Sequence, residues 1–178
     1  MKNTITMIAA CGTNNELGYK NNLPWKRMDH DMQRFHSCVQ GMVIVMGKNS
    51  YDHLPIDLHW KECIVLAEKQ YATKFKRTAV LCSLDEVFAY IQEKYGEGEE
   101  VIICGGASIY RQFLPIANKI LLTRIDGAFE ADAYFPGLIS EEWDEIERVE
   151  YKKDEKNPYD YTFLLLQRKK DTVRHRES

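Results

Sequence analysis

The amino-acid sequence predicts an α/β protein with a mostly parallel central sheet, helices on both faces of that sheet, and a C-terminal pair of antiparallel strands. Three observations support this class. Short runs such as Met42–Met46 are apolar at every position, as expected for strands that are covered on both faces. Segments with helical spacing of apolar residues stand between these runs. Near the end of the chain, two further runs flank a turn-like segment, Asp154–Asp160.

The strands are expected at apolar runs rich in β-forming residues. These runs are Thr4–Cys11, Met42–Met46, Cys63–Leu66, Ala79–Cys82, Val101–Cys104, Ile120–Ile125, Glu145–Tyr151 and Tyr161–Gln167. A long polar loop, Gly12–Arg27, is expected after the first strand. The last two runs form the antiparallel pair.

Three helices are expected between the strands. The first has an apolar face made by residues at helical spacing, which are Met28, Met32, Phe35 and Val39. The second begins at the capping-box sequence SLDE at 83–86 and runs to about Tyr95. The third is Ser108–Leu114.

Length and composition indicate one domain, which we expect to span residues 1–170. The chain has 178 residues, of which 44% are hydrophobic and 29% are charged, and its net charge is −3. These values are ordinary for a globular domain. Charges of both signs are mixed, and the absence of a basic stripe argues against a nucleic-acid partner. Residues 171–178 form a basic tail that we expect to fray into solvent.

The cysteines favour a reducing compartment. They are odd in number and form no CxxC pair, which argues against a disulfide framework and against a metal site. The N-terminal apolar run is too short for a signal peptide, and no stretch could span a bilayer. We therefore expect a cytoplasmic monomer without a metal ion and without a membrane partner.

Two glycine turns mark a candidate ligand site. Ligands of such folds bind beyond the carboxyl ends of the strands, where the sequence has Gly47-Lys48-Asn49-Ser50 and Gly105-Gly106-Ala107-Ser108. Glycine lets the backbone approach a phosphate, and the helix start that follows offers free N–H groups. One such turn is usually only a tight turn, but two suit a dinucleotide. The chain has neither GxGxxG nor a Walker sequence, so a standard Rossmann site or P-loop is not indicated.

Asp31 is the candidate acidic group. It stands on the first predicted helix beside Met32 and one turn before Phe35, so its carboxylate borders the core or faces a cleft. Its position alone favours a solvated or capping aspartate. The functional alternative is a lone acid that pairs with a cationic or amidine-like heterocycle, with Phe35 flanking the ring.

The chain resembles the dihydrofolate reductase family in an ordered set of motifs at family spacing. They are Ile8-Ala9-Ala10, Leu17-Gly18, Leu23-Pro24-Trp25, Asp31-x-x-x-Phe35, Val45-Met46-Gly47-Lys48-x-Ser50-Tyr51, Ile103-Cys104-Gly105-Gly106 with Tyr110, Leu122-Thr123-x-Ile125-Asp126 and Asp132-x-x-Phe135-Pro136. Each motif is weak alone, but the ordered set runs from about residue 5 to residue 167 and is highly specific. One residue is inserted between Trp25 and Asp31, and alignment on Asp31 keeps its distance to Phe35.

The resemblance implies an NADPH-dependent oxidoreductase that reduces 7,8-dihydrofolate to 5,6,7,8-tetrahydrofolate, with hydride transfer to pterin C6 and protonation at N5. Asp31 and Trp25 would be catalytic. Asp31 would bind the 2-amino group and N3 of the pterin, and Trp25 would fix a water near the pterin carbonyl. Thr123 would hold the Asp31 carboxylate through its hydroxyl.

The remaining implied residues fall into two sets. The substrate-binding set is Ile8, Ala9, Asp31, Met32, Phe35, Leu54, Lys61, Cys104 and Thr123. The cofactor-binding set is Ala10, Leu17, Gly18, Asn22, Leu23, Gly47, Lys48, Asn49, Ser50, Leu66, Ala67, Glu68, Lys69, Cys104, Gly105, Gly106, Ala107, Ser108, Ile109, Tyr110 and Gln112.

Three positions depart from the family pattern. Lys61 stands where an arginine usually grips the carboxylate of the folate tail, and a lysine lacks the bidentate fork. Ala67 and Glu68 stand where Ser or Thr and Arg usually bind the 2′-phosphate of NADPH, so use of NADH is an alternative. Ala107 replaces the usual third glycine of the phosphate turn.

Two other functions compete with this prediction. A pyrimidine reductase of riboflavin synthesis would share the cofactor turns but would lack the combination of Trp25, Asp31 and Phe35. A binding protein that has kept the fold and lost turnover is the second alternative, and only the substitutions at Lys61 and Glu68 support it.

Overall fold

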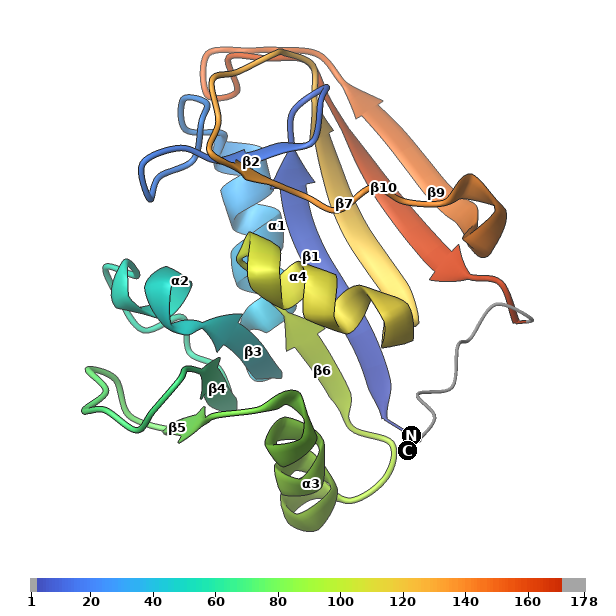
Figure 1. Cartoon of the computed structure of the whole chain (residues 1–178). Helices are drawn as coiled ribbons and strands as arrows, with labels where there is room; N and C mark the ends of the chain where they lie inside the picture. Colours follow the sequence, from blue (N-terminus) through green and yellow to red (C-terminus); the bar gives the residue numbers. More distant parts are fainter. Residues whose placement is uncertain (1–2, 171–178) are drawn as a thin grey trace.

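The computed structural model describes residues 3–170 and confirms the predicted α/β class (Figure 1). The strands are β1 (Thr4–Cys11), β2 (Glu16–Gly18), β3 (Val43–Gly47), β4 (Glu62–Leu66), β5 (Thr78–Leu81), β6 (Glu100–Ile103), β7 (Lys119–Ile125), β8 (Ala133–Tyr134), β9 (Trp143–Tyr151) and β10 (Tyr161–Arg168). Eight of them form one sheet in the order β5-β4-β3-β6-β1-β7-β10-β9, and β2 pairs with β8. The predicted tail at 171–178 lies outside the described residues.

The sheet is parallel from β5 to β7, and β10 runs antiparallel to both β7 and β9. The apolar runs between Thr4 and Ile125 that were predicted as strands therefore form the parallel part of the sheet. The parallel strands β1, β3, β4 and β6 place their carboxyl ends at one edge of the sheet. This edge is where the sequence predicted the ligand site.

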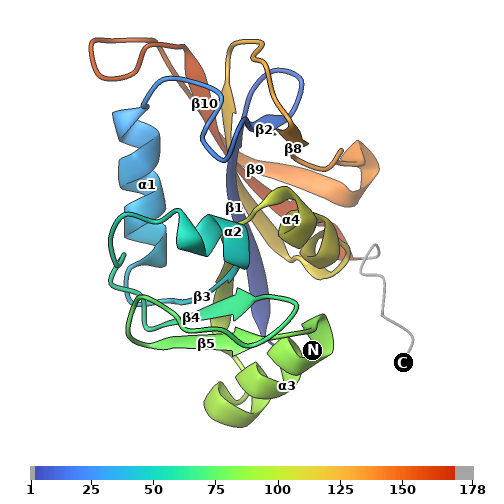
Figure 2. The same ribbon diagram turned by 60° about the vertical axis from the view of Figure 1, so that its left-hand side comes forward.

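Helices cover both faces of the sheet. They are α1 (Asp29–Val39), α2 (Lys48–Asp52), α3 (Leu84–Tyr95) and α4 (Ala107–Phe113), with short 3-10 turns η1 (Leu114–Ile116) and η2 (Ser140–Glu142). Figure 2 shows α1 on one side of β1 and α4 on the other. Val39 of α1 and Tyr51 of α2 pack in one core cluster, whereas Val87 of α3 and Phe113 of α4 pack in the second.

Local sequence explains where the helices begin and end. The Ser83 hydroxyl accepts a hydrogen bond from the Glu86 N–H at 3.2 Å, which caps the start of α3. The Glu86 carboxylate accepts from the Cys82 N–H at 2.7 Å, so it bonds the residue before the cap and not Ser83 as in a full capping box. The third predicted helix ends at Phe113 rather than Leu114. Pro115 follows, and because it has no N–H group the chain continues as the turn η1.

Three short elements, β2, β8 and α2, were not predicted. The segment 12–27, expected to be a loop, contains β2, and the turn after β3 contains α2. Elements of two to five residues are too short to show a period in the sequence. No helix within residues 3–170 is both long enough and apolar enough to cross a membrane.

Candidate active site

A cleft of about 1220 Å³ lies at the carboxyl edge of the parallel strands. Its walls come from the ends of β1, β3, β4 and β6, from α1, α2 and α4, and from the loop around β2. All predicted site residues except Trp25, Lys61 and Thr123 line this cleft. The structure therefore brings together residues as far apart in the sequence as Ile8 and Gln112.

Asp31 stands in one wall of the cleft, and α1 positions it. The same helix turns Met32 and Phe35 into the cleft, and Ile8 and Leu54 complete an apolar slot around the acid. Apolar walls with one convergent polar group are typical of a small-molecule site.

The Asp31 carboxylate is held from behind the cleft wall. The buried Thr123 hydroxyl on β7 donates to Asp31 Oδ1 at 2.7 Å, which is the predicted contact of Thr123. Burial raises the pKa of Asp31, whereas the Thr123 hydrogen bond and the charges of Arg34 and His30 lower it. An acid in this setting has the perturbed titration that is common in functional sites.

The glycine turn at Gly105-Gly106 meets the cleft at the end of β6. Gly105 has φ +107°, and a Cβ there would lie 3.0 Å from the Tyr110 ring, so the position requires glycine. The peptide bond between the two glycines is cis. The Gly105 carbonyl accepts from the Gly47 N–H at 2.8 Å, and the Tyr110 hydroxyl donates to the Ile8 carbonyl at 2.6 Å. These bonds join both predicted turns to the end of β1.

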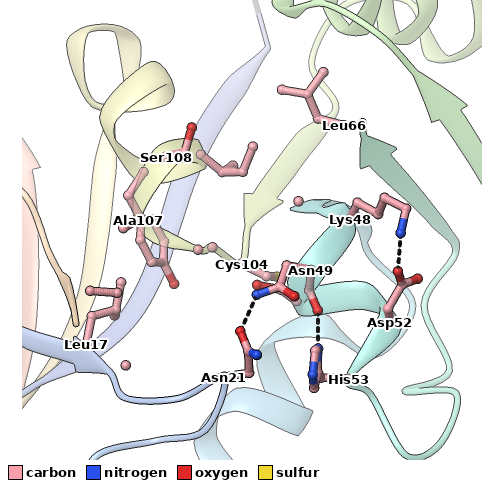
Figure 3. Close-up of a pocket in the computed structure, with 18 of the residues that line it drawn as sticks. Leu17, Asn21, Lys48, Asn49, Asp52, His53, Leu66, Cys104, Ala107 and Ser108 are labelled. Atoms are coloured by element: carbon pink, nitrogen blue, oxygen red, sulfur yellow. Dashed lines mark hydrogen bonds and ion pairs between the residues drawn. The ribbon is translucent and has the colours of Figure 1, made fainter. Parts of the chain in front are cut away.

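Lys48 is engaged within the protein. Its ammonium lies 2.6 Å from Asp52 Oδ2 and 4.7 Å from the centroid of the Tyr71 ring, and the Tyr71 hydroxyl donates to Asp52 Oδ1 at 3.1 Å. Figure 3 shows Lys48 turned toward Asp52. The hydrogen bond from Lys48 lowers the pKa of Asp52, so the Asp52 carboxylate is ionised at neutral pH.

The loop around β2 is connected to α2 across the cleft. The Asn49 amide donates to Asn21 Oδ1 at 2.8 Å, and the His53 ring nitrogen Nδ1 lies 2.7 Å from the Asn49 carbonyl (Figure 3). Leu17 and Leu23 of the same loop line the cleft.

Trp25 lies behind this loop rather than in the cleft lining. Its ring is buried and meets the Phe129 ring edge-on at a centroid distance of 5.6 Å. The Trp25 Nε1 atom is buried, and within residues 3–170 it has no hydrogen-bond partner. A buried N–H donor of this kind usually binds a ligand or a water molecule.

Beyond Leu66, the segment Ala67-Glu68-Lys69 forms another part of the cleft wall. Ala67 is buried, whereas Glu68 and Lys69 are exposed. Neither Glu68 nor Lys69 forms an ion pair with another side chain in the described part of the chain. Both charges are therefore free to act on a ligand.

Lys61, which the resemblance assigned to the substrate tail, does not line the cleft. Lys61 directly precedes β4, so it lies at the amino edge of the parallel sheet, opposite the cleft. Its ammonium is 2.8 Å from Glu99 Oε1 and 4.6 Å from the centroid of the Tyr95 ring at the end of α3. The adjacent Trp60 is buried in the core.

Several cleft residues were missed by the sequence analysis. They are Asn21, Asp52, His53, Tyr71, Cys82, Ser83, Asp132 and Ala133. Asp52 could have been found, because Lys48 and Asp52 have the i, i+4 spacing of an ion pair on a helix. Asp132 and Ala133 reach the cleft through the pairing of β8 with β2, which no sequence signal marks. Within residues 3–170 no group of three or more His, Cys, Asp or Glu side chains is arranged to hold a metal ion.

Comparison with known proteins gives a consistent result. The family model described as "Dihydrofolate reductase" matches residues 4–168. A dihydrofolate reductase of Bacillus subtilis is 31% identical over 165 residues, covering 93% of this chain and 95% of that protein. One of Haemophilus influenzae is 32% identical over 169 residues, covering 93% and 99%. The solved structure of a dihydrofolate reductase from Enterococcus faecalis, complexed with NADP(H) and RAB-propyl, has a TM-score of 0.80 at 23% identity, covering 93% of this chain and 96% of that one.

Proposed function

The chain belongs to the dihydrofolate reductase family, and we propose that it catalyses the NADPH-dependent reduction of 7,8-dihydrofolate to 5,6,7,8-tetrahydrofolate. The observation that carries this proposal is the Asp31 carboxylate, bonded to Thr123 and set in an apolar slot beside the two glycine turns. The pyrimidine-reductase alternative does not account for an acid at this place.

Asp31 is the residue that we assign to the pterin. An ionised carboxylate presents two acceptor oxygens, which match the paired donors of a 2-aminopyrimidine edge. Phe35 and Met32 flank the slot, so that a flat ring is held by apolar contact while Asp31 sets its orientation. Ile8, Ala9, Leu54 and Cys104 are assigned to the remaining walls.

The cleft also suits a dinucleotide. Gly47 and Gly105 allow close backbone approach at two strand ends, and α4 lines the cleft with Ala107, Ser108, Ile109, Tyr110 and Gln112. When bound, NADPH supplies the hydride that reduces pterin C6. The cofactor-binding residues of the sequence analysis are retained in this proposal, with Asn21 added from the same loop.

Water control is the role that we assign to Trp25 and the loop. The buried Nε1 of Trp25 can fix a water molecule near the pterin carbonyl. The proton for N5 would come from water, whose access Asp31 and residues 17–23 control. Asp31 itself orients the ring and acts through its charge.

Organisation and location complete the proposal. One domain over residues 1–170 is supported by the single main sheet, which uses strands from Thr4 to Arg168. A monomer in the cytoplasm is our proposal for its state. The described cysteines are all free thiols, which supports the cytoplasm as the location.

The test is an absorbance assay at the nicotinamide band with NADPH. Turnover with dihydrofolate, and none with the aminopyrimidine substrate of riboflavin synthesis, is the expected result. Turnover of the aminopyrimidine alone would support the pyrimidine reductase instead. Binding of both ligands without turnover would identify a binding protein.

A further inference from the structure

The side chain of Arg34 reaches from α1 to the neighbouring strands β7 and β10. Its Nη1 donates to Thr123 Oγ1 at 3.3 Å and to the Leu122 carbonyl at 3.4 Å. Its Nη2 donates to the Leu164 carbonyl at 3.2 Å, and the guanidinium carbon lies 4.4 Å from the centroid of the Phe163 ring. Four contacts with two strands give the guanidinium a fixed position, although it does not line the cleft.

The contact with Thr123 determines the direction of the hydrogen bond to Asp31. A threonine hydroxyl has one hydrogen, and a guanidinium has no acceptor atom. The Thr123 oxygen must therefore accept from Arg34, and its single hydrogen is directed to Asp31 Oδ1, 2.7 Å away. The three residues form a relay in which each hydrogen bond favours a negative Asp31.

We propose that Arg34 is a positioning residue for the reaction: it fixes the Thr123 hydroxyl as a donor and keeps the Asp31 carboxylate ionised. This inference rests on the proposed function, because it assigns Arg34 to the group that binds the pterin. Burial opposes ionisation of Asp31, since it raises the pKa of this group. The fixed positive charge of Arg34 and the directed hydroxyl act against that effect of burial.

Other titratable groups also face this pair. His30 precedes Asp31 in α1, and its Nδ1 lies 2.6 Å from the Tyr161 hydroxyl on β10. Burial raises the pKa of Tyr161 and of Tyr110 on α4, so both phenols are neutral in the range of the assay. The groups that face Arg34 are Cys38 of α1 and Glu147 and Tyr151 of β9. The Arg34 guanidinium keeps its positive charge across the pH range of the assay. Its removal therefore shifts the titration midpoints in one direction only.

The experiment measures two pH profiles for Arg34→Met. This change removes the charge and the donors but keeps an alkyl stem. The first profile is kcat with dihydrofolate against pH. We expect the pH at its midpoint to rise by about 0.5 unit or more, because a neighbouring cation no longer disfavours protonation of the Asp31–substrate pair. The second readout needs no turnover. The acid-side midpoint for binding of a 2,4-diaminopyrimidine cation should move in the same direction.

Three variants make the test specific. Arg34→Lys keeps the charge and should show a smaller shift. Thr123→Val removes the hydroxyl that bridges Arg34 and Asp31. In a protein that carries Thr123→Val, Arg34→Met should therefore shift the two midpoints less than it does in the wild type. An equal shift in the two proteins would overturn the relay. Arg148→Met removes an exposed guanidinium from β9 and should leave both midpoints at their wild-type values.

The outcomes separate this inference from the proposed function. If the wild type reduces dihydrofolate and Arg34→Met leaves both midpoints unchanged, the role of Arg34 is overturned. If the wild type does not turn over dihydrofolate, the proposed function fails, whereas the binding midpoint still tests the relay. Should Arg34→Met not fold, Arg34→Gln replaces it, because glutamine removes the charge and keeps a hydrogen-bond donor.

Discussion

Burial and hydrogen bonding act in opposite directions on the Asp31 carboxyl group. Desolvation favours the neutral acid, and the Thr123 hydroxyl favours the anion. An acid that only stabilised the fold would have no reason to occupy an apolar slot. The balance is explained if a ligand with paired donors completes the hydrogen bonding of the anion.

Asp31→Asn should remove most of the turnover and leave the protein folded. An amide offers one acceptor oxygen instead of two, and it has no charge with which to stabilise a protonated pterin. We expect kcat at neutral pH to fall about 100-fold or more. The loss should be partly recovered at low pH, where the substrate arrives protonated. Asp29→Asn is the control, because Asp29 pairs with Arg27 outside the cleft. Near-normal activity of Asp31→Asn would contradict the assignment.

The same substitution should raise the stability of the ligand-free protein. The pKa of Asp31 is higher in the folded state than in the unfolded chain, so the folded state binds the proton more tightly. Stability therefore falls as the pH rises from the unfolded pKa through the folded pKa, and Asn avoids this loss. At pH 7 we expect a Tm increase on the order of 2 °C, measured by thermal unfolding. The gain should vanish at a pH below both pKa values, and a lower Tm at pH 7 would contradict the sign.

Lys61→Ala should leave the KM for dihydrofolate within about twofold of the wild-type value. The Lys61 ammonium pairs with Glu99 at the opposite edge of the sheet, and an exposed ion pair contributes less than about 1 kcal/mol to stability. The check is steady-state kinetics beside thermal unfolding. A large rise in KM without loss of Tm would show that the side chain reaches the substrate after all.

At the scale of elements, the central strands and long helices could be predicted because each contains an apolar run or a helical spacing of apolar residues that extends over several positions. β1 and α3 have the predicted ends within a residue, since an apolar run defines the first and a capping-box sequence starts the second. The short elements β2, β8 and α2 could not be predicted. The positions of β2 and β8 depend on their pairing with each other, which no local sequence signal records, and α2 is too short to show a helical period.

The candidate site shows the same division between residues that a sequence pattern marks and residues that only tertiary contacts place. Residues at strand ends and in glycine turns were found from the sequence and the family resemblance. Lys61 does not line the cleft, because alignment gives the position of a residue in the chain but not the direction of its side chain. Tyr71 was missed because it contacts another side chain, Lys48, and only the structure shows that contact.

Glu16→Gln should loosen the loop around β2. The Glu16 side chain is buried, and its two oxygens accept from the Asn14 N–H and from the Phe129 N–H, which joins the loop to the segment after β7. Glutamine has one acceptor, so one backbone donor loses its partner at a cost of about 1–3 kcal/mol. Hydrogen exchange at the amides of Asn14 and Phe129 should become faster. The control is Glu93→Gln on the exposed face of α3, which should exchange like the wild type at both amides.

At the scale of the whole molecule, the cleft joins parts of the fold that are otherwise separate. Its lining takes Phe35 from α1 and Leu54 after α2 on one face of the sheet, and Ile109 from α4 on the other. A ligand that contacts both faces binds only the folded protein. Its binding free energy therefore adds to the stability of the entire domain.

NADPH should accordingly raise the Tm of the wild type. At a free concentration of 100 times Kd, binding contributes about 2.7 kcal/mol, which for a domain of this size corresponds to about 5–10 °C. NADH at the same concentration should raise the Tm by about 3–5 °C less, equivalent to a tenfold difference in Kd. We expect this gap to be modest because Asp52 already neutralises Lys48, which leaves Lys69 to offset Glu68 near the expected 2′-phosphate.

Glu68→Arg tests this account of cofactor preference. The substitution replaces a free negative charge in the cleft wall by a guanidinium, which binds a phosphate with two parallel hydrogen bonds. The Tm increase with NADPH should grow, the increase with NADH should stay the same, and the KM for NADPH should fall with little change in kcat. Because Glu68 is exposed and has no ion-pair partner within residues 3–170, the ligand-free Tm should hardly change. Glu141→Arg, an equally exposed acid far from the cleft in η2, is the matched control. If the wild type is stabilised by NADPH and not at all by NADH, and Glu68→Arg alters neither value, then Glu68 lies outside the reach of the 2′-phosphate.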